Sequence, residues 1–179
     1  PYGTGFAWIS MVLVLPEFQR RGYATRLLRH ALAQLALRGM AAILDATPAG
    51  HAVYLQEGFR DTWGFARYRR ERRDGTEAAR AMPASAPGPT TRPFRESDWP
   101  AIAALDAPAF GADRQPLLRA LAARLPVAAR VVEEQGRLRG FVFGRDGREA
   151  SQIGPLLADD AGTARNLIGD VLSALAADG

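Results

Sequence analysis

The chain has 179 residues, of which 47% are hydrophobic, enough for one domain of ordinary size or two small ones with a packed core. Its net charge is +4 and it contains no cysteine, which excludes disulfide bonds and zinc sites built on cysteine. No run of about 18 apolar residues occurs, so we expect no membrane-spanning helix. The absence of cysteine fits a reducing compartment, and we expect a cytoplasmic protein.

The beginning of the chain predicts a strand, a loop and an amphipathic helix. Residues 6–14 are apolar apart from Ser10, and they predict a strand that is buried on both faces and ends before Pro16. Apolar residues then recur at helical spacing over 21–38, with arginines on the opposite side. Gly39 is the expected helix stop.

The next stretch predicts a second strand and a second helix. Residues 41–45 predict a short buried strand. Thr47-Pro48 is a typical helix start, and it predicts a helix over 49–57 that ends at Gly58. Residues 60–70 alternate loosely in polarity and predict one strand or a bent pair.

The stretch 71–90 differs in composition from the sequence on either side. It is rich in Ala, Pro, Gly and charged residues, and it has too few large apolar side chains to build a core. We therefore interpret it as a linker. The dense basic run 67–73 is interpreted as a solvated strand end rather than as a nucleic-acid-binding patch.

The part of the chain after the linker predicts a second series of elements. A strand over TTRPF comes first, and two helices follow, one from Ser97-Asp98 to about 107 and one over 114–124. A β-hairpin, a short strand and a helix capped by Asp159-Asp160 complete the series. Their ranges are 128–134 and 138–145 around Gln135-Gly136 for the hairpin, 152–157 for the strand, and up to 176 for the helix.

The loop QRRGYATRLL, residues 19–28, joins the first strand to the first helix. The first turn of a helix leaves backbone N–H groups unpaired and has partial positive charge, and a phosphate group satisfies both. Gly22 allows the backbone to approach an anion closely, and Ala24 is too small to block it. Arg20 or Arg21 adds charge-assisted contacts. The pattern therefore predicts a pyrophosphate-binding loop.

In this context the loop resembles the acetyl-CoA-binding motif of the GNAT family, the Gcn5-related N-acetyltransferases. The family pattern is Q/R-x-x-G-x-G/A after a strand, and Gln19, Gly22 and Ala24 fill its fixed positions, with Pro16 before them. Residues 44–59, LDATPAGHAVYLQEGF, resemble the next strand and helix of the same family, including its Y-x-x-x-G-F ending.

The resemblance implies that an acetyl group passes from acetyl-CoA to a primary amine by direct attack, without a covalent enzyme intermediate. It implies that Tyr54 is the general acid that protonates the departing thiolate. Thr47 stands where the family often has an asparagine that contacts the coenzyme, although Thr47 could equally cap the helix. The other implied coenzyme-binding residues are Val12, Leu13 and Val14 at the pantetheine arm, and Gln19, Arg20, Arg21, Gly22, Tyr23, Ala24 and Thr25 at the pyrophosphate.

The general base and the acceptor pocket stay open at this point. Asp45 at a strand end and His51 on the second helix are candidate bases, and each has a plainer interpretation as a surface residue. Glu17 is interpreted as solvated. Trp8 and Trp63 are candidates for the acceptor pocket, but core packing is the simpler interpretation of both. With two histidines in the chain, no histidine-rich metal site is expected.

The resemblance implies an α/β (α+β) fold, a GNAT-like mixed sheet flanked by helices, in an unusual order. Residues 1–70 resemble the C-terminal part of a GNAT domain, 71–90 form the linker, and 91–179 resemble the N-terminal part of a second, degenerate GNAT-like domain. Two hypotheses explain this order: a tandem protein that the chain cuts inside both domains, or a circular permutant. The helix after Gln152 favours the tandem, since the permutant would not need it.

The second domain has the sequence ADDAGTARNL where a coenzyme loop would lie. This sequence lacks the Q-x-x-G-x-A pattern and contains two aspartates, whose carboxylates would repel a pyrophosphate. We therefore expect the second domain to bind CoA weakly or not at all. Because two cut domains leave strand edges unpaired, we also expect the halves to pack together or the chain to form a homodimer.

The predicted function is an acetyl-CoA-dependent N-acetyltransferase that acts on a small-molecule or peptide amine, with no nucleic-acid or membrane partner. A non-catalytic module that binds CoA or acyl-CoA is the main alternative. The basic segment Arg67-Tyr68-Arg69-Arg70 and the high isoelectric point motivate a third hypothesis, a nucleic-acid binder.

Overall fold

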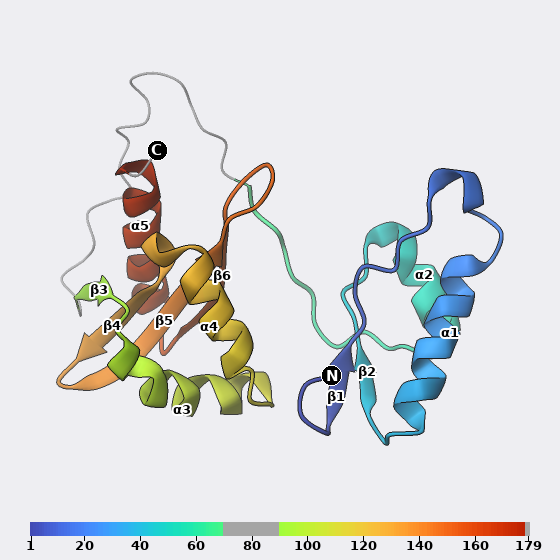
Figure 1. Cartoon of the computed structure of the whole chain (residues 1–179), viewed down its shortest axis with the longest axis horizontal. Coiled ribbons are helices and arrows are strands. Elements are labelled where there is room, and N and C mark those ends of the chain that lie inside the picture. Colours follow the sequence, from blue (N-terminus) through green and yellow to red (C-terminus); the bar gives the residue numbers. More distant parts are fainter. Residues whose placement is uncertain (70–89, 178–179) are drawn as a thin grey trace. The chain divides into compact units, whose positions relative to one another are not determined.

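The computed structural model describes residues 1–69 and 90–177, and the chain divides into two compact units (Figure 1). The N-terminal unit is Pro1–Glu71 and the C-terminal unit is Arg72–Gly179. The predicted linker over 71–90 lies outside the described residues, apart from Thr90. Within the described ranges, no helix is long and apolar enough to cross a membrane.

Two short parallel strands and two helices form the N-terminal unit. β1 (Phe6–Trp8) pairs with β2 (Ala41–Ile43), and α1 (Tyr23–Ala36) connects them. α2 (Pro48–Gln56) follows β2. A parallel pair requires a crossover of this kind, because the chain must return to the end of the sheet from which it started. The strand–helix–strand–helix order is the one that the apolar patterns predict.

The helix ends in this unit follow their sequence signals. Gly39 adopts a φ of 65° just after α1, and Gly58 adopts a φ of 88° just after α2. Thr47 caps α2, because its Oγ1 accepts a hydrogen bond from the N–H of Gly50 at 3.2 Å. Of the two interpretations of Thr47, the structure therefore places it in the capping role.

Two strand predictions in this unit are wrong. Of the strand predicted over 6–14, only β1 forms, and the chain then leaves the sheet, with Met11 at a φ of 58° and 79% exposed. The reason is the short partner strand: β2 ends at Ile43, whose carbonyl accepts a hydrogen bond from the N–H of Ile9 at 2.8 Å. Residues 60–69 of the other predicted strand form no regular element and are exposed throughout.

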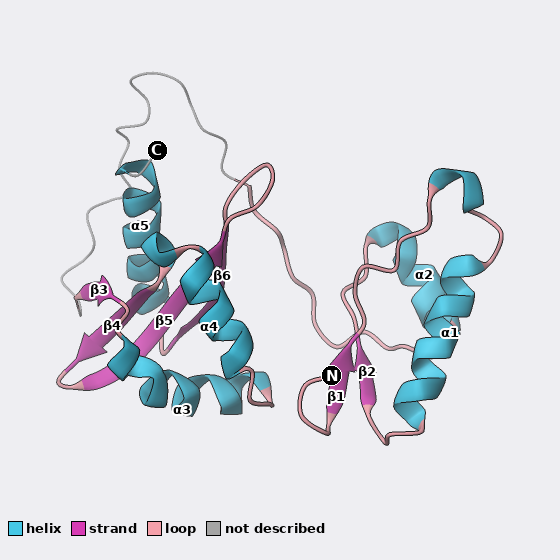
Figure 2. Ribbon diagram, viewed as in Figure 1, coloured by secondary structure: helices cyan, strands magenta, loops and turns pink. Residues whose placement is uncertain are grey.

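The C-terminal unit is a four-stranded antiparallel sheet in the order β3-β4-β5-β6 (Figure 2). All the elements predicted from TTRPF onward are present, with ends shifted by a few residues. The strands are β3 (Thr91–Pro93), β4 (Arg130–Glu134), β5 (Arg137–Arg145) and β6 (Gln152–Ala158), and the helices are α3 (Trp99–Phe110), α4 (Gln115–Arg124) and α5 (Ala161–Ala177).

The main hydrophobic core covers both faces of this sheet, because side chains along β5 alternate between them. Phe141 and Phe143 pack in one cluster with Trp99 of α3 and with α4. Val142, between the two phenylalanines, packs in a second cluster with Leu167 of α5. Helices therefore flank the sheet on both sides, which confirms the predicted α/β fold class.

Arg92 of β3 holds a carboxylate at the start of α3. Its guanidinium donates to both carboxylate oxygens of Asp98 at 2.8 Å, and the N–H of Arg95 donates to the same group at 2.7 Å. The hydrogen bonds from Arg92, followed by that from Arg95, hold the pKa of Asp98 below its usual value. We expect Asp98→Asn to lower the free energy of unfolding by about 1.5–3 kcal/mol at neutral pH, as measured by urea unfolding of the chain.

The pH dependence of that loss tests its electrostatic origin. Because the folded chain binds a proton at Asp98 more weakly than the unfolded chain does, acid favours unfolding. The contribution is complete above the usual aspartate pKa of about 4 and disappears as the pH falls through the lowered value. The difference in unfolding free energy between the wild type and Asp98→Asn should shrink in acid, and a difference independent of pH would contradict this account.

Candidate functional site

Two pockets in the N-terminal unit share part of their walls. The first has a volume of about 120 Å³ and the second about 190 Å³, and Ala24 and Thr25 line both. The other residues of the first are Val12, Leu28, Gly50, Val53 and Tyr54. The other residues of the second are Val14, Phe18, Gln19, Arg20, Gly22 and Tyr23. The structure thus brings most of the predicted coenzyme residues together.

The loop before α1 is held in shape by its own polar groups. The side-chain amide of Gln19 donates a hydrogen bond to the carbonyl of Val14 at 3.1 Å, which closes the loop. Gly22 follows with a φ of 76° and is the residue from which α1 starts. A side chain rarely adopts this left-handed conformation, so the glycine of the motif has a backbone reason for its place.

The first turn of α1 offers unpaired backbone donors to the second pocket. The earliest hydrogen bond of the helix runs from the N–H of Arg26 to the carbonyl of Gly22 at 3.0 Å. Gly22 has no side chain to cap the helix, and the first turn contains no acidic residue. The N–H groups of Tyr23, Ala24 and Thr25 precede that hydrogen bond, and the partial positive charge of the helix end is concentrated there.

Arginines without an acidic partner surround this helix end. Arg20 lines the second pocket, and Arg21 lies over the ring of Phe18 with its guanidinium carbon 5.8 Å from the ring centre. In the described part of the chain, neither arginine forms an ion pair. Most arginines of the C-terminal sheet do, as between Arg130 and Asp170 at 2.8 Å. The positive charge beside α1 is therefore available to an anion.

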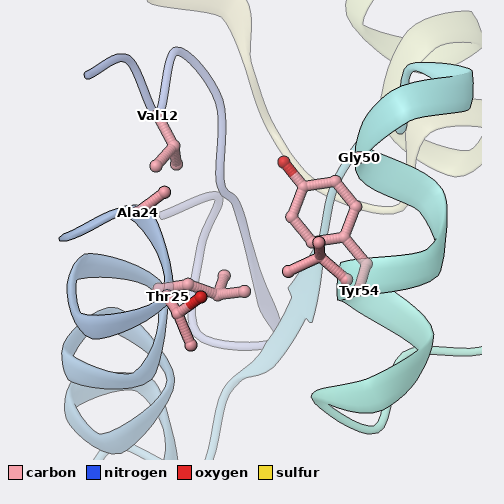
Figure 3. Close-up of a pocket in the computed structure, with 7 residues that line it drawn as sticks. Val12, Ala24, Thr25, Gly50 and Tyr54 are labelled. Atoms are coloured by element: carbon pink, nitrogen blue, oxygen red, sulfur yellow. The ribbon is translucent and has the colours of Figure 1, made fainter. Parts of the chain in front are cut away.

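Tyr54 projects from α2 into the first pocket, and Figure 3 shows its hydroxyl directed toward the side of the cavity where Val12 and Ala24 lie. Its ring packs edge-on against Phe59 with the ring centres 5.9 Å apart. The ring also packs closely on Gly50, because a Cβ at that position would lie 3.0 Å from Cε2 of Tyr54 and would push the ring aside slightly. These contacts fix the ring and leave its polar end at the cavity.

The segment before the loop presents alternate side chains to the pockets. Val12 and Val14 line them, whereas Leu13 is 73% exposed. Arg21 and Thr47 are the other predicted coenzyme residues whose side chains lie outside both linings, the second because it caps α2. The predicted pairing of this backbone with a pantetheine arm stays a prediction.

The candidate bases lie outside both pockets. Asp45 and Glu17 are exposed, and neither lines a cavity. His51 contacts Asp61 through Nε2, 2.7 Å from Oδ1, a partner that sequence reasoning missed because no motif links them. Trp63 is 64% exposed, so its predicted core packing is wrong. In the described residues, no group of three or more acidic or histidine side chains could hold a metal ion.

Three further residues of the first pocket have no part in the predicted site. They are Leu28, Gly50 and Val53. Helical periodicity could have predicted Leu28 as a site residue, because it lies one turn after Ala24 on the same face of α1. Leu28 is 2% exposed and forms the floor of the cavity on that side.

The start of α5, after β6, differs from the start of α1. Asp160 caps this helix, with Oδ1 accepting from the N–H of Thr163 at 2.9 Å and Oδ2 from its hydroxyl at 3.0 Å. The first of these bonds, followed by the second, lowers the pKa of Asp160. Asp159 beside it pairs with Arg139 at 3.1 Å. A carboxylate thus caps the start of α5, whereas the start of α1 has no capping side chain.

We expect Asp160→Ala to cost about 1 kcal/mol of unfolding free energy, because the cap of α5 is lost. The affinity for acetyl-CoA should stay the same, since the sequence motif puts the expected coenzyme site at the start of α1. Urea unfolding and calorimetric titration of the same protein measure both quantities. A large change in affinity with the fold intact would place coenzyme binding at α5 instead.

Two models of known protein families match the chain. Residues 1–59 match the acetyltransferase (GNAT) family, and residues 102–178 match an acetyltransferase (GNAT) domain. No curated protein sequence matches the chain significantly.

Solved structures with the same fold include the two proteins that follow. A protein from Pyrococcus horikoshii assigned as an acetyltransferase is 23% identical with a TM-score of 0.63, and the match covers 96% of this chain and 54% of that one. A GCN5-related N-acetyltransferase from Sphaerobacter thermophilus is 18% identical with a TM-score of 0.59, and the match covers 93% of this chain and 59% of that one. The chain thus spans little more than half the length of either protein.

Proposed function

We propose that this chain, which belongs to the family of GNAT acetyltransferases, binds acetyl-CoA in its N-terminal unit and transfers the acetyl group to an amine. One observation above all supports the proposal. The uncapped start of α1, with Arg20 at the adjoining pocket, and the hydroxyl of Tyr54 meet at two pockets that share Ala24 and Thr25. In this proposal the helix start binds the phosphates and the phenol supplies the proton.

The residues fit the coenzyme by their chemistry. The backbone N–H groups of Tyr23, Ala24 and Thr25 would bind the pyrophosphate oxygens, and Arg20 would add a charge-assisted contact. Gly22 presents no side chain at this helix end. The space beside it is open, because a Cβ there would meet nothing within 4 Å. The backbone of 12–14 would pair with the amides of the pantetheine arm in the manner of an added strand.

In the transfer step, the amine nitrogen attacks the thioester carbonyl carbon and the carbon–sulfur bond breaks. The phenol of Tyr54 would donate its proton to the departing sulfur, and the amine proton would pass to water, since no carboxylate or histidine lines either pocket in the described residues. No step needs a nucleophile from the protein, so the absence of cysteine from the chain is no obstacle.

A thiol assay tests the proposal directly. The chain would be incubated with acetyl-CoA and a panel of primary amines: aminoglycosides, polyamines, amino acids and peptides with a free N-terminus. Released CoA would be measured with a thiol reagent, and a chain without cysteine contributes no background. We expect release that depends on at least one amine. Binding of acetyl-CoA with no release for any amine would favour the non-catalytic alternative.

The non-catalytic CoA-binding module is kept as a second candidate for one reason. Both candidate bases, Asp45 and His51, lie outside the pocket linings, as does Glu17. A site that only holds an acyl-CoA needs the phosphate-binding helix end and the apolar cavity, but it needs no proton acceptor. Replacement of Tyr54 separates the two functions, because the phenol matters to transfer and not to the phosphate contacts.

We also propose that the two family matches represent parts of two successive domains. Both units contain a strand followed by a helix at the corresponding place, β1 and α1 in one and β6 and α5 in the other. A permuted single domain would contain that pair once. In this proposal the C-terminal unit does not bind coenzyme, because Asp160 already occupies the helix end that would receive it.

A further inference from the structure

The first pocket lies between two helices that are linked by one ion pair. Ala24, Thr25 and Leu28 of α1 form one wall, and Gly50, Val53 and Tyr54 of α2 form the other. In the sequence, Arg29 is the residue after Leu28 of the α1 wall, and Glu57 is the residue after the end of α2. In the described residues, the side-chain hydrogen bonds between these two segments are those that Arg29 donates to Glu57.

The geometry of the ion pair restricts both the distance and the angle between the guanidinium of Arg29 and the carboxylate of Glu57. Nε of Arg29 lies 2.8 Å from Oε2 of Glu57, and one terminal nitrogen lies 2.8 Å from Oε1. A planar guanidinium that meets a carboxylate at two points fixes the orientation of the partner as well as its position. The hydrogen bonds from Arg29 also hold the pKa of Glu57 below its usual value, so the carboxylate is charged at neutral pH.

Both partners are tied closely to residues of the pocket. The N–H of Glu57 donates to the carbonyls of Val53 at 3.2 Å and Tyr54 at 3.1 Å, so its backbone moves with the last turn of α2. Arg29 adjoins Leu28, which is the one residue of α1 that is fully buried. A displacement of the ion pair would therefore displace the wall from which the phenol of Tyr54 projects.

We propose that the Arg29–Glu57 ion pair is a positioning contact. It keeps Tyr54 at a fixed distance from the first turn of α1. The structural part stands on the contacts above, and the catalytic consequence rests on the proposed function. Neither residue lines a pocket, so the pair acts through the placement of α2 and not by contact with a substrate.

Breaking the pair has separate consequences for catalysis and binding. The phosphate contacts belong to the start of α1 and should persist, so the KM for acetyl-CoA should change little. The proton donor belongs to α2, and misplacement of a reacting group by about 1 Å can cost up to about a hundredfold in rate. We expect Arg29→Met and Glu57→Gln each to lower kcat about tenfold. A merely stabilising pair would leave kcat unchanged in the folded fraction.

The test combines kinetics with hydrogen exchange on the full chain. In Arg29→Met, the amides of α2 should exchange about two- to fivefold faster, because an exposed ion pair contributes modestly to local stability. The exchanged pair Arg29→Glu with Glu57→Arg should recover most of the lost kcat and protection. The matched control is Arg124→Met, which breaks an exposed pair with Asp146 in the C-terminal unit and should change neither quantity.

The outcomes separate this inference from the proposed function. Unchanged exchange in α2, or unchanged kcat with the pair broken, would overturn the positioning role. Failure of the exchanged pair to recover kcat would also count against it. A wild-type chain that acetylates no amine would refute the proposed function, while the exchange measurement would still decide whether the pair holds α2 in place.

Discussion

Tyr54→Phe is expected to lower kcat about a hundredfold or more, while the affinity for acetyl-CoA stays the same. Phenylalanine keeps the ring contacts with Gly50 and Phe59 and removes only the hydroxyl at the cavity. The departing thiolate then has no fixed proton donor, whereas the phosphate contacts on α1 are untouched. Steady-state kinetics gives the rate, and calorimetric titration of the same protein gives the dissociation constant.

Tyr68→Phe is the matched control for this substitution, because Tyr68 is 92% exposed and lines neither pocket. Its kcat should equal that of the wild type. Should Tyr54→Phe retain wild-type kcat, the hydroxyl would not be the proton donor. Should it lose coenzyme binding along with the rate, Tyr54 would belong to the binding surface instead.

Arg20→Glu combined with Gly22→Asp is expected to weaken acetyl-CoA binding about a hundredfold or more. Two carboxylates would replace a cation and a bare backbone beside the first turn of α1, and like charges repel the pyrophosphate. Aspartate suits this test, since it tolerates the left-handed conformation of Gly22, whose φ is 76°, better than most residues do. The substitution adds backbone strain but no clash, because a Cβ there meets nothing within 4 Å, and we expect the fold to persist.

Arg38→Glu, just beyond the other end of α1, reproduces the charge reversal of Arg20→Glu and so controls for most of the change in net charge. It should bind acetyl-CoA nearly as well as the wild type, because its distance from the helix start leaves the phosphate contacts intact. Circular dichroism should give the same helix content for all three proteins. Equal affinities in wild type and double variant would show that the loop is not the phosphate site.

Local signals in the sequence predicted the helices, the helix ends and the hairpin correctly, whereas the strands over 6–14 and 60–70 were predicted too long or wrongly. Gly39 and Gly58 mark helix ends with a positive φ, and Gln135-Gly136 forms the tight hairpin turn between β4 and β5. The motif around Gly22 predicted an open helix start, and α1 begins there without a capping side chain. Each of these features depends on a few consecutive residues, which is why a single sequence is enough to find them.

Features that depend on distant partners were missed. The apolar run 6–14 is typical of a strand between two neighbouring strands. Its pairing with β2, however, reaches only as far as Ile9. Met11 and Leu13 are exposed, although their side chains are as apolar as those of a buried strand. Burial depends on what lies beside the segment, and the pattern of one segment contains no information about that.

The candidate site shows the same division between local and distant information. The half that we expect to bind phosphate is one continuous loop and could be predicted, whereas the contacts that organise the other half join separate segments. Arg29 pairs with Glu57, and His51 contacts Asp61. No motif links the members of either pair, and their chemistry is visible only when the backbone brings them together.

The most direct test of the central claim is a titration of the isotope-labelled chain with acetyl-CoA, followed by amide chemical shifts. We predict that the largest changes fall on Gly22, Tyr23, Ala24 and Thr25 and on residues 12–14, because these supply the backbone groups that would contact the coenzyme. The amides at the start of α5 should not move. Changes at α5 alone, or none anywhere in a folded chain at millimolar acetyl-CoA, would contradict the assignment of the coenzyme site to the N-terminal unit.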